Sequence, residues 1–284
     1  MNNLVSYLFK TNAVNICPEN KPFWYTSGKI GPYYINSEFL YGSKEDSIKL
    51  LDFINLEKEN KMMLPKKIFE KVKKQYDENE IFHNVINEMK EKILKTVNID
   101  EINYISGGER RDWFFSYMIS YLLDKPHITI FKDLEVIVSD CNFENTNKLQ
   151  NINGAKVLHV ADLVTEASSY FRAWIPSIEN LGANILYSIC VIDRMQGGSS
   201  KLEKAGINCM SIFKVQKELF DDALKLNVFN EEQYKMVCEF IENPDETMKN
   251  FVESHPEFIE DALNSSDEKT ASRAKLCIEK GWYK

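Results

Sequence analysis

The sequence predicts an α/β fold in which a central parallel sheet is flanked by helices. Between residues 102 and 213, short β-branched or apolar runs alternate with helical segments, a pattern typical of a parallel sheet covered on both faces. The chain has 284 residues, of which 44% are hydrophobic and 27% are charged. It is therefore long enough, and apolar enough, to bury a sizeable core as an ordinary folded protein.

The first hundred residues divide into two stretches of different character. Residues 1–43 are rich in aromatic side chains around Ser27-Gly28-Lys29 and Gly31-Pro32, which predicts short strands and turns. In 44–97, apolar residues recur at helical spacing among many charged ones, which predicts two or three helices with solvated polar faces. We interpret 1–100 as an N-terminal hood segment followed by a helical insertion at 44–98.

Residues 101–217 contribute the α/β core. We expect strands at 102–105, 127–131, 156–160, 185–192 and 207–213, and helices at 111–123, 168–181 and 199–205. Residues 134–138 are a further strand-like run, expected to form a hairpin or a loop strand. Residues 218–284 predict a helical extension in which Pro244 begins one helix, and Ser265 and Glu268 have the spacing of a capping box before another.

Composition argues against several classes of protein. A formal net charge of −8 is unfavourable for general nucleic-acid binding, which needs clustered Lys and Arg. No apolar run approaches the ~20 residues that cross a bilayer, and residues 1–10 lack the hydrophobic region of a signal peptide, so we expect a cytoplasmic protein without membrane contacts. The six cysteines and four histidines are dispersed, which favours reduced thiols over disulfides or a zinc site.

The most informative segment runs from Gly154 to Ser169. A buried strand leads to Asp162, a turn rich in small and hydroxyl side chains follows, and a helix then begins. The free N–H groups at a helix start, and the helix dipole, favour an anion at such a turn. In an open α/β sheet the turn lies at the carboxyl end of a strand, where ligands bind. The segment therefore predicts an anion site.

This segment resembles the phosphoribosyl pyrophosphate motif of type I phosphoribosyltransferases, in which four apolar residues precede two acidic residues and a Thr-Gly-rich loop. The resemblance implies that family's fold, and it assigns Asp162 to the ribose hydroxyls of the donor. It also implies Mg²⁺ as cofactor, which Asp162 would contact only indirectly, through those hydroxyls. Ala161 stands where the first acid belongs. The residues assigned to the 5′-phosphate are Thr165, Glu166, Ala167, Ser168 and Ser169, with Glu166 and Ala167 standing where a small residue and a Gly are usual.

A second segment, residues 23–36, is similar to the amino-terminal segment of orotate phosphoribosyltransferases. Ser27, Gly28, Pro32, Tyr33 and Asn36 match that family's pattern in order. The resemblance places the segment at the orotate and pyrophosphate end of the site, with Ser27, Gly28, Tyr33 and Tyr34 as substrate-binding candidates. Thr26 replaces a ligand-contacting Lys of the family, and Lys29 is the candidate to supply that charge.

A third constellation follows the strand at 102–105, where the family has its pyrophosphate loop. Gly107 and Gly108 would permit close backbone approach to an anion, and Arg110 and Arg111 would add fork-shaped donors. The alternative is a surface Arg pair capped by Asp112.

Two further regions matter to the resemblance. Residues 131–149 should hold the family's mobile catalytic loop, but only Phe131-Lys132-Asp133 resembles its start, and the expected Lys-x-His-Gly stretch is absent. Lys132 is nevertheless a catalytic candidate. Arg194, at the end of the strand 185–192, is a candidate for shaping the base pocket.

The resemblance implies transfer of a phosphoribosyl group from phosphoribosyl pyrophosphate to orotate or a related pyrimidine base, by a homodimer, with Asp162, Lys29 and Lys132 as catalytic residues. Two alternatives stay open. One is a catalytically reduced protein of the same fold that binds a phosphorylated ribose or nucleotide in a regulatory role. The other is an interaction module that acts through the helical insertion and the C-terminal helices.

Overall fold

The computed structural model describes residues 2–149 and 151–283 and divides into two units. One unit is Ser37–Val215, and the other combines residues 1–36 with 216–284. The helices at 44–96 therefore belong with the central sheet, whereas the N-terminal segment belongs with the C-terminal helices. Each unit is described separately below.

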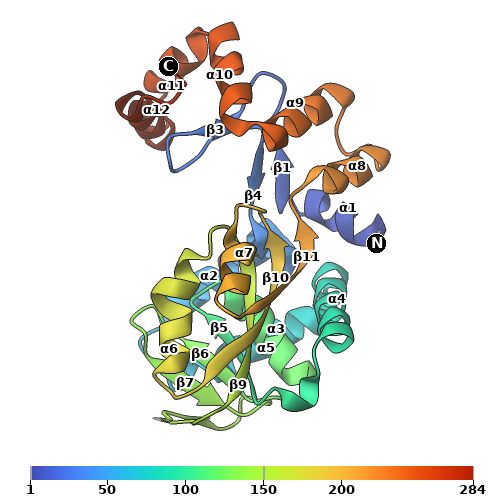
Figure 1. The fold of residues 1–284 in the computed structure, drawn as a ribbon, viewed down its shortest axis with the longest axis vertical. Helices are drawn as coiled ribbons and strands as arrows, with labels where there is room; N and C mark the ends of the chain where they lie inside the picture. The colour runs from blue at the N-terminus through green and yellow to red at the C-terminus, as the bar shows by residue number, and fades with distance from the viewer. Residues whose placement is uncertain (1, 150, 284) are drawn as a thin grey trace. The chain divides into compact units, whose positions relative to one another are not determined.

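The unit Ser37–Val215 contains a seven-stranded sheet in the order β11-β10-β9-β5-β6-β7-β8 (Figure 1). Its strands are β5 (Tyr104–Gly108), β6 (His127–Ile130), β7 (Val136–Ser139), β8 (Thr146–Asn147), β9 (Lys156–Val164), β10 (Asn184–Asp193) and β11 (Asn208–Lys214). All five expected core strands are present.

The sheet is mixed rather than wholly parallel. β5, β6, β9, β10 and β11 are parallel to their neighbours within that set, whereas β7 pairs antiparallel with β6 and β8 antiparallel with β7. The turn between β6 and β7 is short, with Phe131 N donating to Glu135 O. A parallel neighbour would need a crossover of a dozen or more residues, so this connection permits only a hairpin, as expected for 134–138.

Helices flank this sheet (Figure 1). α5 (Asp112–Leu122) packs against β5 and β9, α6 (Ile175–Glu179) against β10, and α7 (Gly198–Lys204) against β11. The insertion forms three helices, α2 (Lys44–Glu57), α3 (Leu64–Glu78) and α4 (Glu80–Thr96), and α3 and α4 both contact α5. Apolar residues at helical spacing, such as Phe82, Met89 and Ile93, are fully buried, as the periodicity predicts. Short helices η1 (Ser37–Tyr41) and η2 (Ile99–Glu101) complete the connections.

The second unit begins with a helix, α1 (Asn2–Lys10), so the expectation of strands and turns throughout 1–43 is wrong there. Val5 and Leu8 are buried, and their i, i+3 spacing is the helical signal that the aromatic run beyond them obscured. The expected short strands follow as the antiparallel pairs β1 (Val14–Ile16) with β4 (Tyr33–Ile35) and β2 (Phe23–Trp24) with β3 (Ile30–Gly31).

Five helices form the rest of this unit: α8 (Lys217–Lys225), α9 (Glu231–Glu242), α10 (Pro244–Ser254), α11 (Glu257–Leu263) and α12 (Glu268–Lys280). α10 begins at Pro244 as predicted. The capping box expected from Ser265 and Glu268 is wrong, because Asp267 is the N-cap of α12 and its side chain accepts from Thr270 N at 3.0 Å. In the described ranges, none of the helices combines the length and apolar character that a bilayer crossing requires.

Candidate functional site

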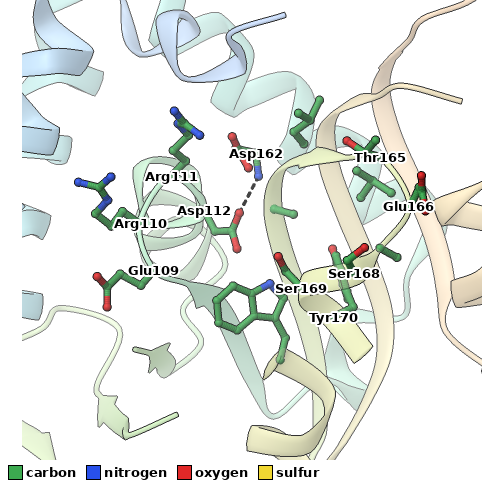
Figure 2. Close-up of a pocket in the computed structure, with 15 residues that line it drawn as sticks. Glu109, Arg110, Arg111, Asp112, Asp162, Thr165, Glu166, Ser168, Ser169 and Tyr170 are labelled. Carbon is green, nitrogen blue, oxygen red and sulfur yellow. Dashed lines mark hydrogen bonds between the residues drawn. The ribbon is translucent and has the colours of Figure 1, made fainter. Parts of the chain in front are cut away.

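A cavity of about 480 Å³ opens at the carboxyl ends of β5 and β9 (Figure 2). Its position follows from topology: β5 is hydrogen-bonded to β6 on one side and to β9 on the other, so the chain reverses its direction of travel across the sheet between β5 and β9. Ligands bind at such switch points in open α/β sheets. The lining comes from residues 109–112, residues 161–170 and Trp174.

One wall of the cavity is the turn at 165–169, which follows the end of β9. The strand runs to Val164, four residues farther than predicted, so Asp162 lies within it rather than after it. Thr165, Ser168 and Ser169 line the cavity (Figure 2). A short π-helix, η3 (Tyr170–Trp174), then leads into α6, so the helix expected at 168–181 begins with a wide turn.

Ala167 has a backbone conformation that favours glycine, the residue usual at this position of the family's motif. Its φ of 59° lies in the left-handed region, where a side chain costs roughly 1–2 kcal/mol and glycine costs little. The Ala167 methyl group is buried in the apolar cluster that includes Tyr170 and Trp174. The turn therefore adopts a conformation that favours glycine while retaining a packed side chain.

The start of α7 also packs against the turn at 165–169. Gly198 N donates to Thr165 O at 3.0 Å. A Cβ atom on Gly198 would lie 2.6 Å from that same oxygen and 3.0 Å from Ala167 N. Only glycine therefore allows α7 to approach the turn this closely.

Asp162 lines the cavity together with the turn at 165–169 and with residues 109–112. Ser37 Oγ donates to Asp162 Oδ2 at 2.7 Å, and Asp162 N donates to Asp112 Oδ1 at 3.0 Å. Burial, and next the negative charge of Asp112, raise the pKa of Asp162 well above its usual range, although the Ser37 hydrogen bond and the charge of Arg111 act in the opposite direction. The Asp162 carboxyl thus holds its proton to a higher pH than an ordinary aspartate.

The opposite wall carries the two arginines (Figure 2). Arg110 Nη1 donates to Asn55 Oδ1, and Arg111 Nε pairs with the buried Glu38 carboxylate at 2.9 Å. Because a guanidinium has five N–H donors and Arg111 is 52% exposed, these contacts leave donors available to an anion in the cavity.

Comparison with known proteins finds orotate phosphoribosyltransferases both among sequence relatives and among solved structures. No family model matches the chain. The orotate phosphoribosyltransferase of Sulfolobus acidocaldarius is 23% identical over 222 residues, which cover 77% of this chain and 88% of that protein. Among solved structures, UMP synthase of Leishmania donovani superposes with a TM-score of 0.57 at 17% identity, covering 84% of this chain and 42% of that one. Orotate phosphoribosyltransferase of Francisella tularensis superposes with a TM-score of 0.54 at 15% identity, covering 84% and 96%.

The chain has the fold of the type I phosphoribosyltransferases. Its fold is the one expected from the sequence: a central sheet flanked by helices, with a helical C-terminal extension. At the cavity, the chain departs from the family's motifs at Ala161, at Ala167 and in the loop between β5 and α5.

The structure gives Gly107 and Gly108 a packing role. Both lie in β5 and are buried, and neither lines the cavity. A Cβ atom on Gly107 would collide with the Ser116 side chain, and one on Gly108 with the Trp174 ring. Their lack of a side chain is therefore required by the helices that pack on β5.

Several predicted site residues are not among those that line this cavity. Ser27, Gly28, Lys29, Tyr33 and Tyr34 belong to the other unit, in which Lys29 Nζ pairs with Asp245 at 2.6 Å and lies 4.2 Å from the centroid of the Trp282 ring. Lys29 is thus engaged within its own unit.

Lys132 and Arg194 belong to the same unit as the cavity but do not line it. Lys132 is exposed in the turn between β6 and β7, and its backbone N–H donates to Glu109 Oε2. The buried Arg194 Nε finds no hydrogen-bond partner among the described residues. Residues 131–147, where the family's mobile loop was expected, form the tight turn and the strands β7 and β8 instead.

Sequence reasoning missed Asp112 as a member of the site and treated it only as a cap on the Arg pair. It is buried, and Asp112 Oδ2 accepts from Gly108 N at 3.0 Å. The signal available in the sequence was an acidic residue at the first position of a helix that follows a Gly-Gly strand end.

Proposed function

We propose that this chain transfers a phosphoribosyl group from phosphoribosyl pyrophosphate to a pyrimidine base, orotate or a close relative. The observation that carries the proposal is that the hydroxyl-bearing turn 165–169, Asp162 and the Arg110–Arg111 pair line one cavity at the switch point of the sheet. Its volume of about 480 Å³ falls within the range of pockets for small organic ligands. The sequence relative from Sulfolobus acidocaldarius carries the same activity in its name.

Within this proposal, the turn binds the terminal phosphate of the sugar. Thr165, Ser168 and Ser169 offer hydroxyl donors, and the exposed backbone at a helix start favours an anion. The Glu166 carboxylate lies 3.6 Å from Lys201 Nζ, so its charge is partly balanced beside the anion.

Asp162 positions the ribose by accepting from its hydroxyls, and Arg110 and Arg111 neutralise the departing pyrophosphate. The reaction is a displacement at the anomeric carbon by a ring nitrogen of the base. It asks for alignment and charge stabilisation rather than covalent chemistry. An ionised Asp162 also offsets positive charge that develops on the sugar. Because the pKa of Asp162 is raised, donor binding is expected to strengthen as pH rises and this carboxyl ionises.

Magnesium fits this site only as part of the substrate complex. Among the described residues there is no group of three or more His, Cys, Asp or Glu side chains placed to hold a metal ion. When bound, Mg²⁺ would neutralise negative charge on the donor's pyrophosphate. Asp162 would then act on the ion indirectly, through the ribose hydroxyls.

A second candidate function is binding of a phosphorylated ribose or nucleotide without turnover, in a regulatory role. Two observations favour it. Ala161 occupies the place of the family's first acid, and the segment 131–147 is a hairpin with Lys132 exposed outside the cavity. This candidate keeps the phosphate turn and Asp162 but lacks the residues of the mobile loop.

The deciding experiment measures loss of orotate in the presence of phosphoribosyl pyrophosphate and Mg²⁺, followed by a panel of other bases. Turnover of orotate supports the first function, and turnover of another pyrimidine alone moves the specificity to that base. Stabilisation of the protein by the donor without turnover of any base supports the second function. Absence of donor binding overturns both. Light scattering on the same sample tests the predicted homodimer.

A further inference from the structure

The strands β5 and β9 separate at the edge of the cavity, and the side chain of Asp112 occupies the gap. The two strands are paired only from Tyr104 with Val157 to Ser106 with His159. Beyond that point Asp112 Oδ1 accepts from Asp162 N and Asp112 Oδ2 accepts from Gly108 N, both at 3.0 Å. One carboxylate therefore links the backbones of both strands where the sheet opens. Figure 2 shows the hydrogen bond to Asp162.

The buried His159 lies next to the Asp112 carboxylate. His159 Nε2 lies 3.6 Å from Asp112 Oδ2, and His159 Nδ1 is hydrogen-bonded to Ser106 Oγ at 2.9 Å. Both His159 and Ser106 are fully buried. The Ser106 hydrogen bond fixes the His159 ring beside the Asp112 carboxylate, whereas His159 Nε2 itself has no hydrogen-bond partner among the described residues.

The Asp112 carboxylate retains capacity for a ligand. An ionised carboxylate offers about four acceptor positions, and the two backbone N–H groups use two of them. Asp112 also lines the cavity together with Asp162. The side chain is therefore both held by the protein and available to a hydroxyl group in the cavity.

Ala161 also lines the cavity but has no carboxylate to offer to a hydroxyl group. Ala161 is 2% exposed, and its side chain belongs to the apolar cluster that contains Trp174 and Ala173. We propose that Asp112 supplies the second carboxylate of the donor-sugar site and accepts a hydrogen bond from a ribose hydroxyl. This inference rests on the proposed function, because it assumes that the cavity binds a phosphorylated ribose.

The test uses Asp112→Asn and two probes, ribose 5-phosphate and inorganic phosphate, titrated calorimetrically into the full chain. Asn keeps the size of the side chain but removes its charge and one acceptor. We expect the affinity for ribose 5-phosphate to fall about tenfold or more, as for loss of a hydrogen bond to a charged group, and the affinity for phosphate to stay within about twofold, the scatter that such single contacts show. Asp100→Asn is the matched control, because Asp100 is exposed at the opposite end of β5.

If Asp112 has a purely structural role, Asp112→Asn should lower the affinity for both probes together, and that result overturns the inference. Unchanged affinity for ribose 5-phosphate in Asp112→Asn also overturns it, but leaves the proposed function standing. If the wild-type chain binds neither probe, the proposed function fails as well.

A second measurement covers the case in which Asp112→Asn does not fold. Asp162→Asn leaves Asp112 in place, because the contact between them runs through the Asp162 backbone N–H. We expect Asp162→Asn still to bind ribose 5-phosphate more tightly than 2-deoxyribose 5-phosphate or 3-deoxyribose 5-phosphate. Equal affinity for all three would show that Asp162 alone contacts the hydroxyls and would overturn the inference.

Discussion

Gly198→Ala should displace the phosphate turn without touching any ligand. The Cβ atom would lie 2.6 Å from Thr165 O, 2.7 Å from Val164 Cγ1 and 3.0 Å from Ala167 N, whereas ordinary contacts begin at 3.4 Å. Two of these three atoms are backbone atoms of the turn, so no side-chain rotation relieves them. Either α7 or the turn must move by roughly 0.8 Å to restore ordinary contact.

The size of these displacements indicates how far Gly198→Ala should lower the free energy of unfolding and the affinity for ligand. Overpacking of this kind costs about 1–3 kcal/mol of unfolding free energy. Displacement of a binding group by about 1 Å can cost on the order of 100-fold in activity. We therefore expect affinity for ribose 5-phosphate to fall between about 10-fold and 100-fold.

Calorimetric titration and chemical denaturation together check this expectation. The matched control is Gly206→Ala, at the other end of α7, where φ is 82° and a Cβ atom meets nothing within 4 Å. That substitution should cost about 1–2 kcal/mol of stability through backbone strain alone, with unchanged affinity. Full ligand affinity in Gly198→Ala, or an equal loss in Gly206→Ala, would refute the reasoning.

Three further substitutions test the same site. Asp162→Asn should weaken phosphoribosyl pyrophosphate binding and remove its rise with pH. Because the folded-state pKa of Asp162 is raised above the ordinary 3.8, wild-type stability falls as pH rises from that value through the raised pKa, and the variant should lack this fall in denaturation curves measured across pH. Thr165→Val should weaken phosphate binding about tenfold or more by deleting one hydrogen bond to a charged group, and an unchanged titration would remove Thr165 from the site. Ala167→Gly should change the unfolding free energy by less than about 1 kcal/mol, because relief of left-handed strain offsets the lost burial of a methyl group; a loss above about 2 kcal/mol in urea denaturation would contradict that balance.

The sheet could be predicted from sequence because its parallel strands are largely buried and most are rich in apolar residues. The β7–β8 edge of the sheet was harder to predict. Both strands are short, and only the tight turn before β7 shows that β7 pairs antiparallel with β6. α1 escaped prediction because its nine residues present only one helical repeat of apolar side chains before the aromatic segment. Local pattern thus predicted the strands and helices of the core but missed α1 and β8.

The site residues that follow one another along the chain could be predicted from the sequence. Those that only folding brings together were missed. Asp162 and the turn at 165–169 follow one another along the chain, so a motif describes them. Asp112 contacts the backbone of Asp162 across fifty residues of sequence, and no local pattern encodes that contact. Gly107 and Gly108 were predicted to approach a ligand, but the atoms that exclude a side chain there belong to Ser116 and Trp174.

A crystal structure of the full chain with ribose 5-phosphate tests the central claim most directly. We expect the phosphate group to lie in the turn at 165–169, within hydrogen-bond distance of Thr165 and Ser169, with the sugar hydroxyls directed toward Asp162. A phosphate bound elsewhere in the chain, or a turn that stays empty at saturating ligand, would contradict it.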